Sequence, residues 1–421
     1  MEVKQIVVVG AGFAGLGATQ SLAKSKNAEV TIIDRRNHHL FQPLLYQVAM
    51  AGLSPAEIAV PIRSEFTNQD NVRVILGEVK SVDLNQQCVT TGDGDIPYDM
   101  LVLACGANHS YFGQNQWEPF APGLKTIEQA TEIRRRVLLA FEKAEITTDP
   151  KMKKKHLTFV VVGAGPTGVE LAGSLGELSR FTLSKDFKNI DPRQTRIILV
   201  EAGKRILSQF SPSLTAKAAR QLESLGVTIW TESLVTTISE DGIQIGDESV
   251  MASTVLWAAG VKPSPLNEQL NAETDRVGRV VVEPDLSLKN HPEVFVLGDQ
   301  ACSVDQKTGE PLPGLAPVAI QQGRHTGRNI RRRLDGQETL PFKYFDKGIM
   351  ATIGRMKAIV ETKHMKLTGS FAWYAWLFVH IYYLIGFRNK VFVLLQWATS
   401  YLRFKKGARL IAEKSWRAYD D

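Results

Sequence analysis

A glycine-rich turn directly after the first apolar run constrains the fold most. Residues 6–9 are apolar and predict a short buried strand, and Gly10, Gly12 and Gly15 follow it with the spacing GxGxxG before a predicted helix. The first glycine permits a tight turn, the second lets a pyrophosphate approach the backbone, and the third lets the helix pack on the strand. Backbone N–H groups at the helix start then face phosphates. This segment predicts a dinucleotide site.

An acidic residue supports this interpretation. A second apolar strand, residues 30–33, ends in Asp34, close to the distance at which a carboxylate meets a ribose hydroxyl. A glycine-rich turn by itself is a purely structural turn about as often as it is a nucleotide-binding site. The strand, turn, helix and acid together favour dinucleotide binding.

The same pattern recurs in the middle of the chain. Gly163, Gly165 and Gly168 follow another apolar strand, and the next strong strand ends in Glu201. This acid lies farther from its glycines than is usual, because residues 179–195 intervene. They predict a helix extension and a loop. A carboxylate there repels a 2′-phosphate and favours NADH over NADPH. Lys204 and Arg205 leave the opposite preference open. A purely structural repeat is the alternative, and the two acids argue against it.

Composition narrows the class of protein. The 421 residues suffice for two or three domains, and 44% apolar and 22% charged residues indicate a folded globular chain. The net charge is +6, and the last 34 residues hold eight basic and three acidic side chains. This concentration suggests a basic tail on an anionic surface and argues against a nucleic-acid footprint. The chain enters its first strand too early for a signal peptide, so we expect it to stay in the cytoplasm.

Cysteine usage excludes several classes of site. Cys88, Cys105 and Cys302 are the only cysteines and have no CxxC spacing, which argues against metal, dithiol and disulfide-scaffold functions.

Several further motifs resemble one family. LACGA, WAAGV and VFVLGD, together with both glycine motifs, resemble the two-dinucleotide-binding-domain flavoproteins. FQPLLYQVAMAGLSP, HSYFG, GPTGVELAG, APVAIQQG and DKGIMATIGR narrow the resemblance to the type II NADH dehydrogenases, or NADH:quinone oxidoreductases. The resemblance covers nearly the whole chain and implies an α/β fold with two Rossmann-like domains plus a C-terminal amphipathic membrane-anchoring region.

The resemblance implies a domain plan and an activity. FAD-binding residues 1–115 and 290–345 would form one discontinuous domain, residues 116–289 an NADH-binding domain, and residues 346–421 the anchoring region. The activity would be FAD-dependent, non-proton-pumping oxidation of NADH with two-electron reduction of a membrane quinone, in a homodimer. A redox-gated FAD/NADH switch and a sulfide:quinone oxidoreductase are the alternatives, although only Cys302 could serve the latter. Disulfide reductases are excluded because residues 38–47 contain no cysteine pair.

The resemblance also implies site residues. For FAD they are Gly10, Ala11, Gly12, Phe13, Ala14, Gly15, Asp34, Arg35, Val79, Asp299 and Ala316. For NADH they are Gly163, Gly165, Thr167, Gly168, Glu201 and Gly260. Gln321 and Gln322 would bind quinone, and Lys347 is a family signature without an assigned role.

Glu170 is the catalytic candidate. It follows Gly168 by two residues, and we expect it in the first turn of the helix, where the helix dipole favours an acid by about 0.3–1 kcal/mol. That is its structural interpretation. In the family the matching glutamate lies near nicotinamide and flavin, which implies that it positions the nicotinamide or delivers a proton. A first-turn site lowers a carboxyl pKa, so a general acid there needs burial.

The glutamine pair has two interpretations. A neutral amide can donate to a quinone carbonyl without a desolvated charge, whereas glutamines on helices are usually solvated. Many family members have a further glutamine where this chain has Pro317, which puts a two-amide quinone site in doubt.

The C-terminal region predicts membrane contact. Residues 367–387 carry no formal charge and are rich in Trp and Tyr, which prefer the membrane interface, with His380 in the middle. The next helix predicts an apolar face and a polar face, as in a helix that lies on a membrane. The apolar face holds Val391, Leu394, Leu395, Ala398 and Leu402, and the polar face holds Gln396, Thr399, Ser400 and Arg403. Basic residues that would meet anionic lipid are Lys405, Lys406 and Arg409.

We expect a peripheral, monotopic protein on the cytoplasmic side of the inner membrane of a cell. A dimer interface or core helix pair, and a true membrane span, are the alternatives for the C-terminal segments.

Overall fold

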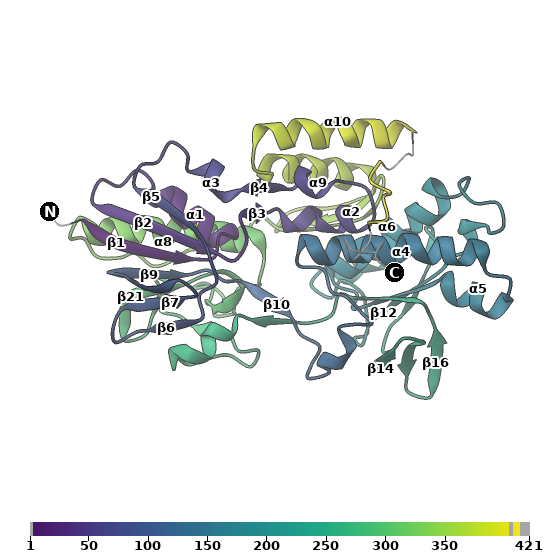
Figure 1. Ribbon diagram of the computed structural model, residues 1–421, viewed down its shortest axis with the longest axis horizontal. Helices are drawn as coiled ribbons and strands as arrows, with labels where there is room; N and C mark the ends of the chain where they lie inside the picture. The colour runs from purple at the N-terminus through teal and green to yellow at the C-terminus, as the bar shows by residue number, and fades with distance from the viewer. Residues whose placement is uncertain (1–2, 404–406, 413–421) are drawn as a thin grey trace, which may run out of the picture. The chain divides into compact units, whose positions relative to one another are not determined.

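The computed structural model describes residues 3–403 and 407–412 and contains two compact units. Unit 1 comprises Met1–Leu40, Ala59–Asn108 and Val261–Lys347. Unit 2 comprises Phe41–Ile58, His109–Gly260 and Gly348–Asp421. These boundaries differ from the expected ones, because residues 41–58 pack in unit 2, residues 261–289 pack in unit 1, and the C-terminal region belongs to unit 2. Figure 1 labels the elements.

Unit 1 is built on a six-stranded sheet. Its central strand β1 (Lys4–Val9) pairs in parallel with β2 (Ala28–Asp34) and β9 (Met100–Leu103), as continuous apolar runs predict for a sheet covered on both faces. The order is β20 (Ser287–Leu288), β21 (His291–Val296), β9, β1, β2 and β5 (Val72–Leu76). Strand β21 pairs with β9, so a late segment completes a sheet that begins at residue 4.

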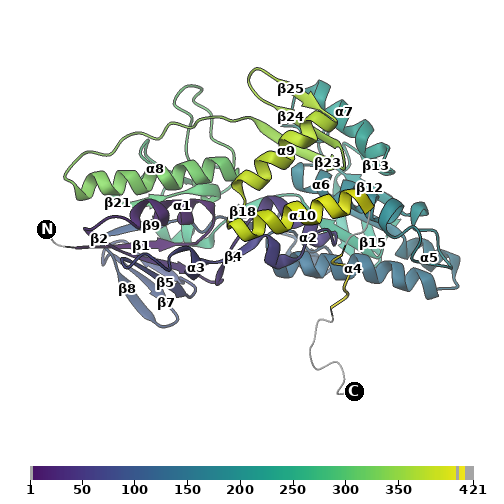
Figure 2. The ribbon, with the colours of Figure 1, turned by 90° about the horizontal axis from the view of Figure 1, so that it is seen from above.

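Two helices pack closely on one another in unit 1. They are α1 (Phe13–Leu22) and α8 (Ala316–Leu334), which lie side by side in Figure 2. A Cβ atom on Gly323 would lie 2.0 Å from the carbonyl oxygen of Ala14, and one on Gly327 would lie 2.4 Å from Cβ of Ser21. Glycine is therefore required where the two helices meet.

The other elements of unit 1 are shorter. A three-stranded antiparallel sheet shares the apolar core of β1 and β9. Val82 and Val89 on its strands, and Tyr98 directly after its last strand, belong to that core. These strands are β6 (Ser81–Asp83), β7 (Cys88–Thr91) and β8 (Gly94–Pro97). The remainder are β3 (His38–Leu40), β4 (Ala59–Pro61), α3 (Ile62–Glu65), β18 (Val261–Pro263), η6 (Pro265–Leu270), β19 (Val280–Val281), η7 (Gly298–Gln300) and β22 (Ala301–Cys302). Strand β10 (Ala107–His109) carries the chain from unit 1 to unit 2.

Unit 2 repeats the parallel architecture. Strand β11 (Thr158–Val162) is fully buried and lies between β12 (Arg196–Val200) and β17 (Thr254–Trp257), while β13 (Val227–Trp230) forms the edge. Helix α6 (Pro166–Glu177) follows the second glycine turn. The predicted helix extension is present as a π-helical segment η4 (Leu178–Thr182). The remaining elements of this part are η3 (Asn115–Trp117), α4 (Ile127–Ile146), α5 (Pro150–His156), η5 (Pro192–Gln194), α7 (Pro212–Glu223), β14 (Val235–Ser239), β15 (Gly242–Ile245) and β16 (Glu248–Met251).

Two distant segments also belong to unit 2. The first holds η1 (Gln42–Leu44), α2 (Leu45–Ala49) and η2 (Pro55–Glu57). The last of these is a single helical turn, and Ser54 and Glu57 form a capping box at its start. The second segment holds β23 (Ile349–Gly354), β24 (Lys357–Glu361), β25 (Lys366–Thr368), α9 (Ser370–Tyr383) and α10 (Phe387–Arg403).

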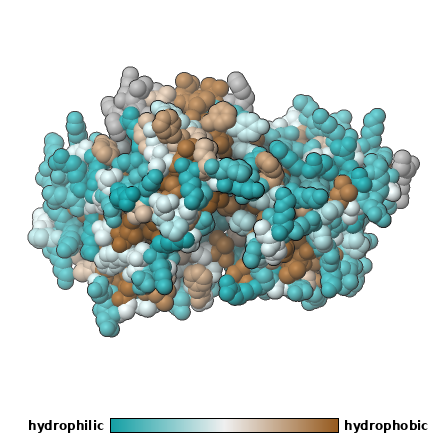
Figure 3. All heavy atoms as spheres, turned by 180° about the vertical axis from the view of Figure 1, so that it is seen from behind, coloured by the Kyte–Doolittle hydropathy of each residue, from teal (hydrophilic) through white to brown (hydrophobic). Residues whose placement is uncertain are grey.

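The two C-terminal helices lie alongside one another and expose apolar side chains. On α9, Phe371 and Phe378 are 78% and 70% exposed, whereas Trp376 and His380 face inward. On α10, Val391, Leu394, Leu395 and Ala398 are exposed as predicted. Brown apolar side chains gather at the upper edge of Figure 3, over these helices. Within the described residues, none of the helices is long and apolar enough to cross a membrane.

Parts of the predicted polar face lie outside the described side chains. Gln396 faces inward and donates to the carbonyl oxygen of Gly52 at 3.1 Å. Arg409 is described and pairs with Asp186 of the same unit. Six side chains named in the sequence predictions lie outside the described ones: Thr399, Ser400, Leu402, Arg403, Lys405 and Lys406.

Candidate active site

The first glycine turn has the geometry that its spacing predicts. Gly10 has φ of +96°, and a Cβ there would lie 2.4 Å from the carbonyl oxygen of Ala104. A Cβ on Gly15 would lie 1.8 Å from the carbonyl oxygen of Gly10. Around Gly12, by contrast, a Cβ would meet nothing within 4 Å among the described atoms. Two glycines therefore close the turn, and the middle one leaves the open cradle that a dinucleotide phosphate fits.

Asp34 braces this turn. Its Oδ2 accepts the backbone N–H of Ala11 at 2.7 Å, and its Oδ1 accepts that of Arg36 at 2.8 Å. Both bonds fix the carboxylate at the carboxyl end of β2, where a ligand of an open parallel sheet binds.

His39 also supports the turn, which sequence reasoning missed. Its Nδ1 lies 2.8 Å from the carbonyl oxygen of Ala11, and its ring packs edge-on against Phe13. Burial lowers the pKa of His39, so the neutral imidazole donates Nδ1–H to that carbonyl. No spacing rule links a histidine to a turn 28 residues earlier, so no sequence signal could have identified it.

The second turn has the same geometry. Gly163 has φ of +97°, a Cβ on Gly168 would lie 1.8 Å from the carbonyl oxygen of Gly163, and a Cβ on Gly165 would meet nothing described within 4 Å. The carboxylate of Glu201 accepts the backbone N–H groups of Ala164 at 2.8 Å and Gly203 at 2.7 Å. Although extra residues precede it in the sequence, Glu201 therefore contacts its glycine turn in the same way as Asp34 contacts the first turn.

The two basic residues after Glu201 differ in their contacts. The guanidinium of Arg205 donates to the carbonyl oxygens of Phe210 at 3.1 Å and Ser208 at 2.9 Å. These bonds direct its planar fork into its own loop. Lys204 is exposed.

Glu170 does not lie in the first turn of its helix. Helix α6 begins at Pro166, so Glu170 is its fifth residue, and the expectation of a first-turn acid favoured by the dipole is wrong. Burial raises its carboxyl pKa to about 8, against one backbone hydrogen bond from Thr352 that lowers it. The carboxyl group therefore holds a proton near neutral pH, as a proton donor requires.

Strand β23 lies directly on the Glu170 face of α6. A Cβ on Gly173 would lie 1.8 Å from the carbonyl oxygen of Ile353, so only glycine permits this approach. One turn further on, Glu177 Oε1 accepts the backbone N–H of Arg355. The DKGIMATIGR stretch, a family signature in the sequence, thus supplies the backbone that holds Glu170.

The two glutamines of α8 have different environments in unit 1. Gln322 is buried; its Oε1 accepts the backbone N–H of Gly298 at 2.8 Å, and its Nε2 donates to Ser303 Oγ at 2.7 Å. Gln321 is partly exposed, and its amide makes two bonds with the backbone of Phe345, at 3.0 and 2.9 Å.

The other predicted FAD residues also lie in unit 1. Asp299 follows Gly298 in η7, and Gly314 lies against it, since a Cβ there would be 3.1 Å from Asp299 Oδ1. Ala316 is the first residue of α8, Val79 is buried and Arg35 is exposed.

The remaining NADH residues lie in unit 2. Thr167 is in the first turn of α6, and Gly260 has φ of +74° after β17. The structure therefore groups the predicted FAD and quinone residues in unit 1, and the predicted NADH residues with Glu170 in unit 2.

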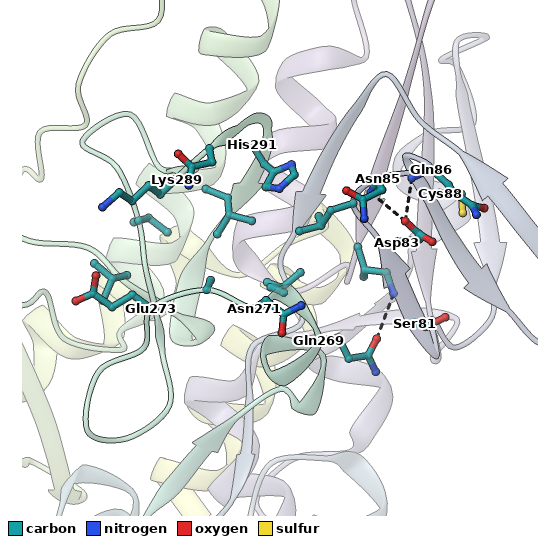
Figure 4. A pocket seen from close by; sticks show the side chains of 18 of the residues that line it. Ser81, Asp83, Asn85, Gln86, Cys88, Gln269, Asn271, Glu273, Lys289 and His291 are labelled. Carbon is teal, nitrogen blue, oxygen red and sulfur yellow. Dashed lines mark hydrogen bonds between the residues drawn. The ribbon is translucent and has the colours of Figure 1, made fainter.

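A polar hollow of about 900 Å³ lies in unit 1, away from these residues. Figure 4 shows Asp83 bonded to the backbone N–H groups of Asn85 and Gln86, and Gln269 accepts that of Val82 at 3.2 Å. None of the predicted site residues is among the described residues that line it. Its polar groups bond to its own walls, and we assign no site there.

The cysteines do not form a reactive pair. All three are free thiols, and burial raises the pKa of Cys105 to about 12 and also raises that of Cys302. Thiols of this kind are poor nucleophiles. Over residues 3–403 and 407–412, no group of His, Cys, Asp and Glu side chains could hold a metal ion.

Comparisons with known proteins agree with this geometry. Residues 4–323 match the family described as pyridine nucleotide-disulphide oxidoreductase. The type II NADH:quinone oxidoreductase NdhA of Mycobacterium tuberculosis is 42% identical over 97% of this chain and 90% of that protein.

Solved structures share the fold. The chain is similar to a Plasmodium falciparum NDH2 structure in complex with NADH, with a TM-score of 0.88, 18% identity, and coverage of 97% of this chain and 100% of that one. It is also similar to the sulfide:quinone oxidoreductase of Aquifex aeolicus, with a TM-score of 0.74, 18% identity, and coverage of 92% of each chain. The extent and level of identity to the M. tuberculosis relative show that the chain belongs to the type II NADH:quinone oxidoreductase family.

Proposed function

We propose that unit 1 holds FAD and unit 2 holds NADH in an enzyme that oxidises NADH and reduces a quinone. The observation that carries the proposal is the doubled turn, in which Ala11 bonds to Asp34 and Ala164 bonds to Glu201. Each turn has an open middle glycine, so each unit can bind one dinucleotide. FAD, when bound, supplies the two-electron redox chemistry between NADH and quinone.

The first turn and its neighbours would hold FAD. The N–H groups at the start of α1 face a pyrophosphate, and Asp34 meets a ribose hydroxyl. Asp299 lies at the start of η7, after strand β21, and is assigned the ribityl chain. The buried Gln322 supports this turn through the Gly298 N–H, so its contribution to the site includes positioning.

Glu201 would set the preference for NADH. Its carboxylate is held by two backbone N–H groups, at the position where a 2′-phosphate would meet its charge. Arg205 does not offset this charge, because its guanidinium is bonded to carbonyl oxygens of its own loop.

Glu170 would deliver a proton to the quinone. Oxidation of NADH by a quinone consumes one proton from solution, since NADH, a proton and a quinone give NAD⁺ and a quinol. The Glu170 carboxyl, partly buried and protonated near neutral pH, is the acid that can give up this proton. Gln321 would donate an amide hydrogen to a quinone carbonyl through the hydrogen of Nε2 that the Phe345 contact leaves over.

Helices α9 and α10 would lie on the membrane. Their outward faces carry Phe and Leu side chains, while Gln396 and His380 face inward, the reverse of a helix on a water-soluble surface. A quinone dissolves in lipid, so this attachment brings the enzyme to its substrate. Attachment to the cytoplasmic side of the inner membrane and the homodimer stay predictions, which vesicle orientation and analytical ultracentrifugation test.

An anaerobic two-step experiment tests the proposed activity. NADH is added to the purified FAD-loaded protein, the flavin absorbance is followed, and a soluble quinone is then added. We expect bleaching, rapid recovery, and repetition over many turnovers. Bleaching without recovery would refute the quinone assignment and favour a redox-gated switch, and absence of bleaching would refute NADH binding at the second turn.

A further inference from the structure

A small, partly open cavity with both polar and apolar lining lies in unit 2, beside the helix that carries Glu170. Its volume is about 50 Å³, and α2, α6, β23, α9 and α10 all contribute to its wall. A water molecule needs at least about 10–15 Å³ of such space and takes up about 30 Å³ in the liquid, so the cavity has room for roughly two. Its lining includes Gln47, Ser174, Glu177, Thr352 and Trp376.

The cavity contains polar groups that need a partner. Trp376 is 1% exposed, and its Nε1–H lacks a hydrogen-bond partner among the described residues. The hydroxyl of the buried Ser174 likewise makes none of the described hydrogen bonds. A buried N–H left without a partner is destabilising, and a water molecule in the cavity supplies the missing acceptor.

Another part of the cavity lining is held by a chain of hydrogen bonds. Trp397 Nε1 donates to Gln47 Oε1 at 2.8 Å, and Gln47 Nε2 donates to the hydroxyl oxygen of Tyr46 at 2.9 Å. These bonds join α10 to α2 and position amide and hydroxyl groups against the cavity. These hydrogen bonds order the polar part of the lining, where water can bind.

The cavity reaches Glu170 through two residues. Ser174 is four residues after Glu170 on α6, so the two side chains are neighbours on one face of the helix. Thr352, which also lines the cavity, donates its backbone N–H to the Glu170 carboxylate. Glu177 lies about one turn beyond Ser174 on the same face of α6 and also lines the cavity.

We propose that this cavity holds a row of water molecules and that Ser174 relays protons from it to the carboxylate of Glu170. The Ser174 hydroxyl gives its proton to Glu170, and it takes another from the adjacent water in the same step. Each turnover moves one proton along the row, which equals the net proton uptake of the reaction. This inference rests on the proposed role of Glu170.

Trp376 positions one of these water molecules. Its Nε1–H donates to a water oxygen and holds that molecule in the row, so Trp376 is a positioning residue. Its ring stacks on His380 at 4.3 Å between ring centres and packs at 5.4 Å from that of Trp397. A phenylalanine retains much of this packing and removes the donor.

The first test is direct observation of the water. A high-resolution crystal structure of the FAD-loaded protein should show ordered water bonded to Trp376 Nε1 and Ser174 Oγ. A dry cavity would overturn the proposal, and this outcome does not depend on activity.

The second test separates the two halves of the reaction. In Ser174→Ala, the rate of flavin reduction by NADH should stay unchanged, while the rate of flavin reoxidation by quinone falls at least about tenfold, less than the roughly 10²–10⁴-fold contribution of a group that itself gives the proton to the reacting atom. Ser174→Thr should restore most of this loss because it retains the hydroxyl. Trp376→Phe should slow reoxidation in the same way, and Ser213→Ala, on the exposed surface of α7, is the matched control.

A readout of the proton itself completes the test. Time-resolved infrared spectroscopy after a pH jump should show slower protonation of the Glu170 carboxyl in Ser174→Ala, with the signal identified by its absence in Glu170→Gln. Unchanged protonation and reoxidation rates in Ser174→Ala, or an equal slowing of both half-reactions, would contradict the relay. If the unmodified protein fails to reduce quinone, the proposed function fails instead, and the crystallographic and infrared tests still decide the relay.

Discussion

Glu201 accepts a hydrogen bond from the backbone N–H of Ala164 at 2.8 Å, just as Asp34 accepts that of Ala11 at 2.7 Å in the other unit. In both turns the donor is the residue after the first glycine of the motif. Each acid therefore closes its own turn, at the position where we propose that it meets the ribose of a bound dinucleotide.

Glu201→Gln should reduce the preference for NADH. The amide can keep one backbone contact through its oxygen, and it removes the negative charge that opposes a 2′-phosphate. We expect the ratio of kcat/KM for NADH to that for NADPH to fall about tenfold, the equivalent of 1.4 kcal/mol. Steady-state kinetics with both nucleotides measures this ratio.

Arg205→Ala is the control for that experiment. Because Arg205 bonds to Ser208 and Phe210, its loss should lower thermal stability and leave the nucleotide preference unchanged. A marked change of preference in Arg205→Ala would show that its guanidinium reaches the nucleotide.

Glu170→Gln should slow flavin reoxidation by quinone by about 10²-fold or more, the contribution of a positioned acid, while NADH reduces the flavin at nearly the original rate. Stopped-flow absorbance resolves the two steps. Equal rates of reoxidation in the variant and the unmodified protein would remove Glu170 from the proton path.

Stability should depend on pH through Glu170. Its folded-state pKa is raised from 4.5 to about 8, so between these values the folded protein binds the proton more tightly than the unfolded chain does. The contribution of this group to stability is therefore complete below pH 4.5 and is lost as the pH rises through about 8. The melting temperature should fall less over pH 5–9, a range set by that shift, in Glu170→Gln. Glu240→Gln, an exposed change in the same unit, should leave the profile unaltered.

Gln322→Leu should destabilise the flavin-binding unit. The substitution leaves the partly buried Gly298 N–H without its acceptor, at a cost of up to about 1–3 kcal/mol. Urea denaturation with FAD bound measures this loss. Gln321→Ala should instead raise KM for quinone with a smaller effect on stability, because its contacts are partly exposed.

The double variant Phe371→Ser, Phe378→Ser should bind anionic lipid vesicles at least about tenfold more weakly. Full burial of each phenylalanine is worth about 1.5–3 kcal/mol, so partial insertion of two suffices for this effect. Vesicle sedimentation measures the binding. Ile146→Ser, an 81% exposed residue of α4, is the matched control, and equal losses in both variants would contradict membrane contact through α9.

The sequence by itself determined the parts of the site that depend on neighbouring residues. A glycine turn between a strand and a helix uses contacts within a few residues, so both turns could be predicted from spacing. The outward apolar face of α10 followed in the same way from helical periodicity, since Val391, Leu394 and Leu395 recur at one face.

Only the tertiary structure decided the environment of the reacting groups. The sequence places Glu170 in the first helical turn, where the helix dipole would lower its pKa, yet desolvation in the folded protein raises that pKa to about 8, although a backbone hydrogen bond from Thr352 on β23 opposes the increase. The contact of His39 with the first turn could likewise not be predicted from the sequence. The same holds for the grouping of Ser174 and Trp376 around one cavity. Local spacing encodes backbone conformation, whereas desolvation and cavity shape depend on segments that meet only when the chain folds.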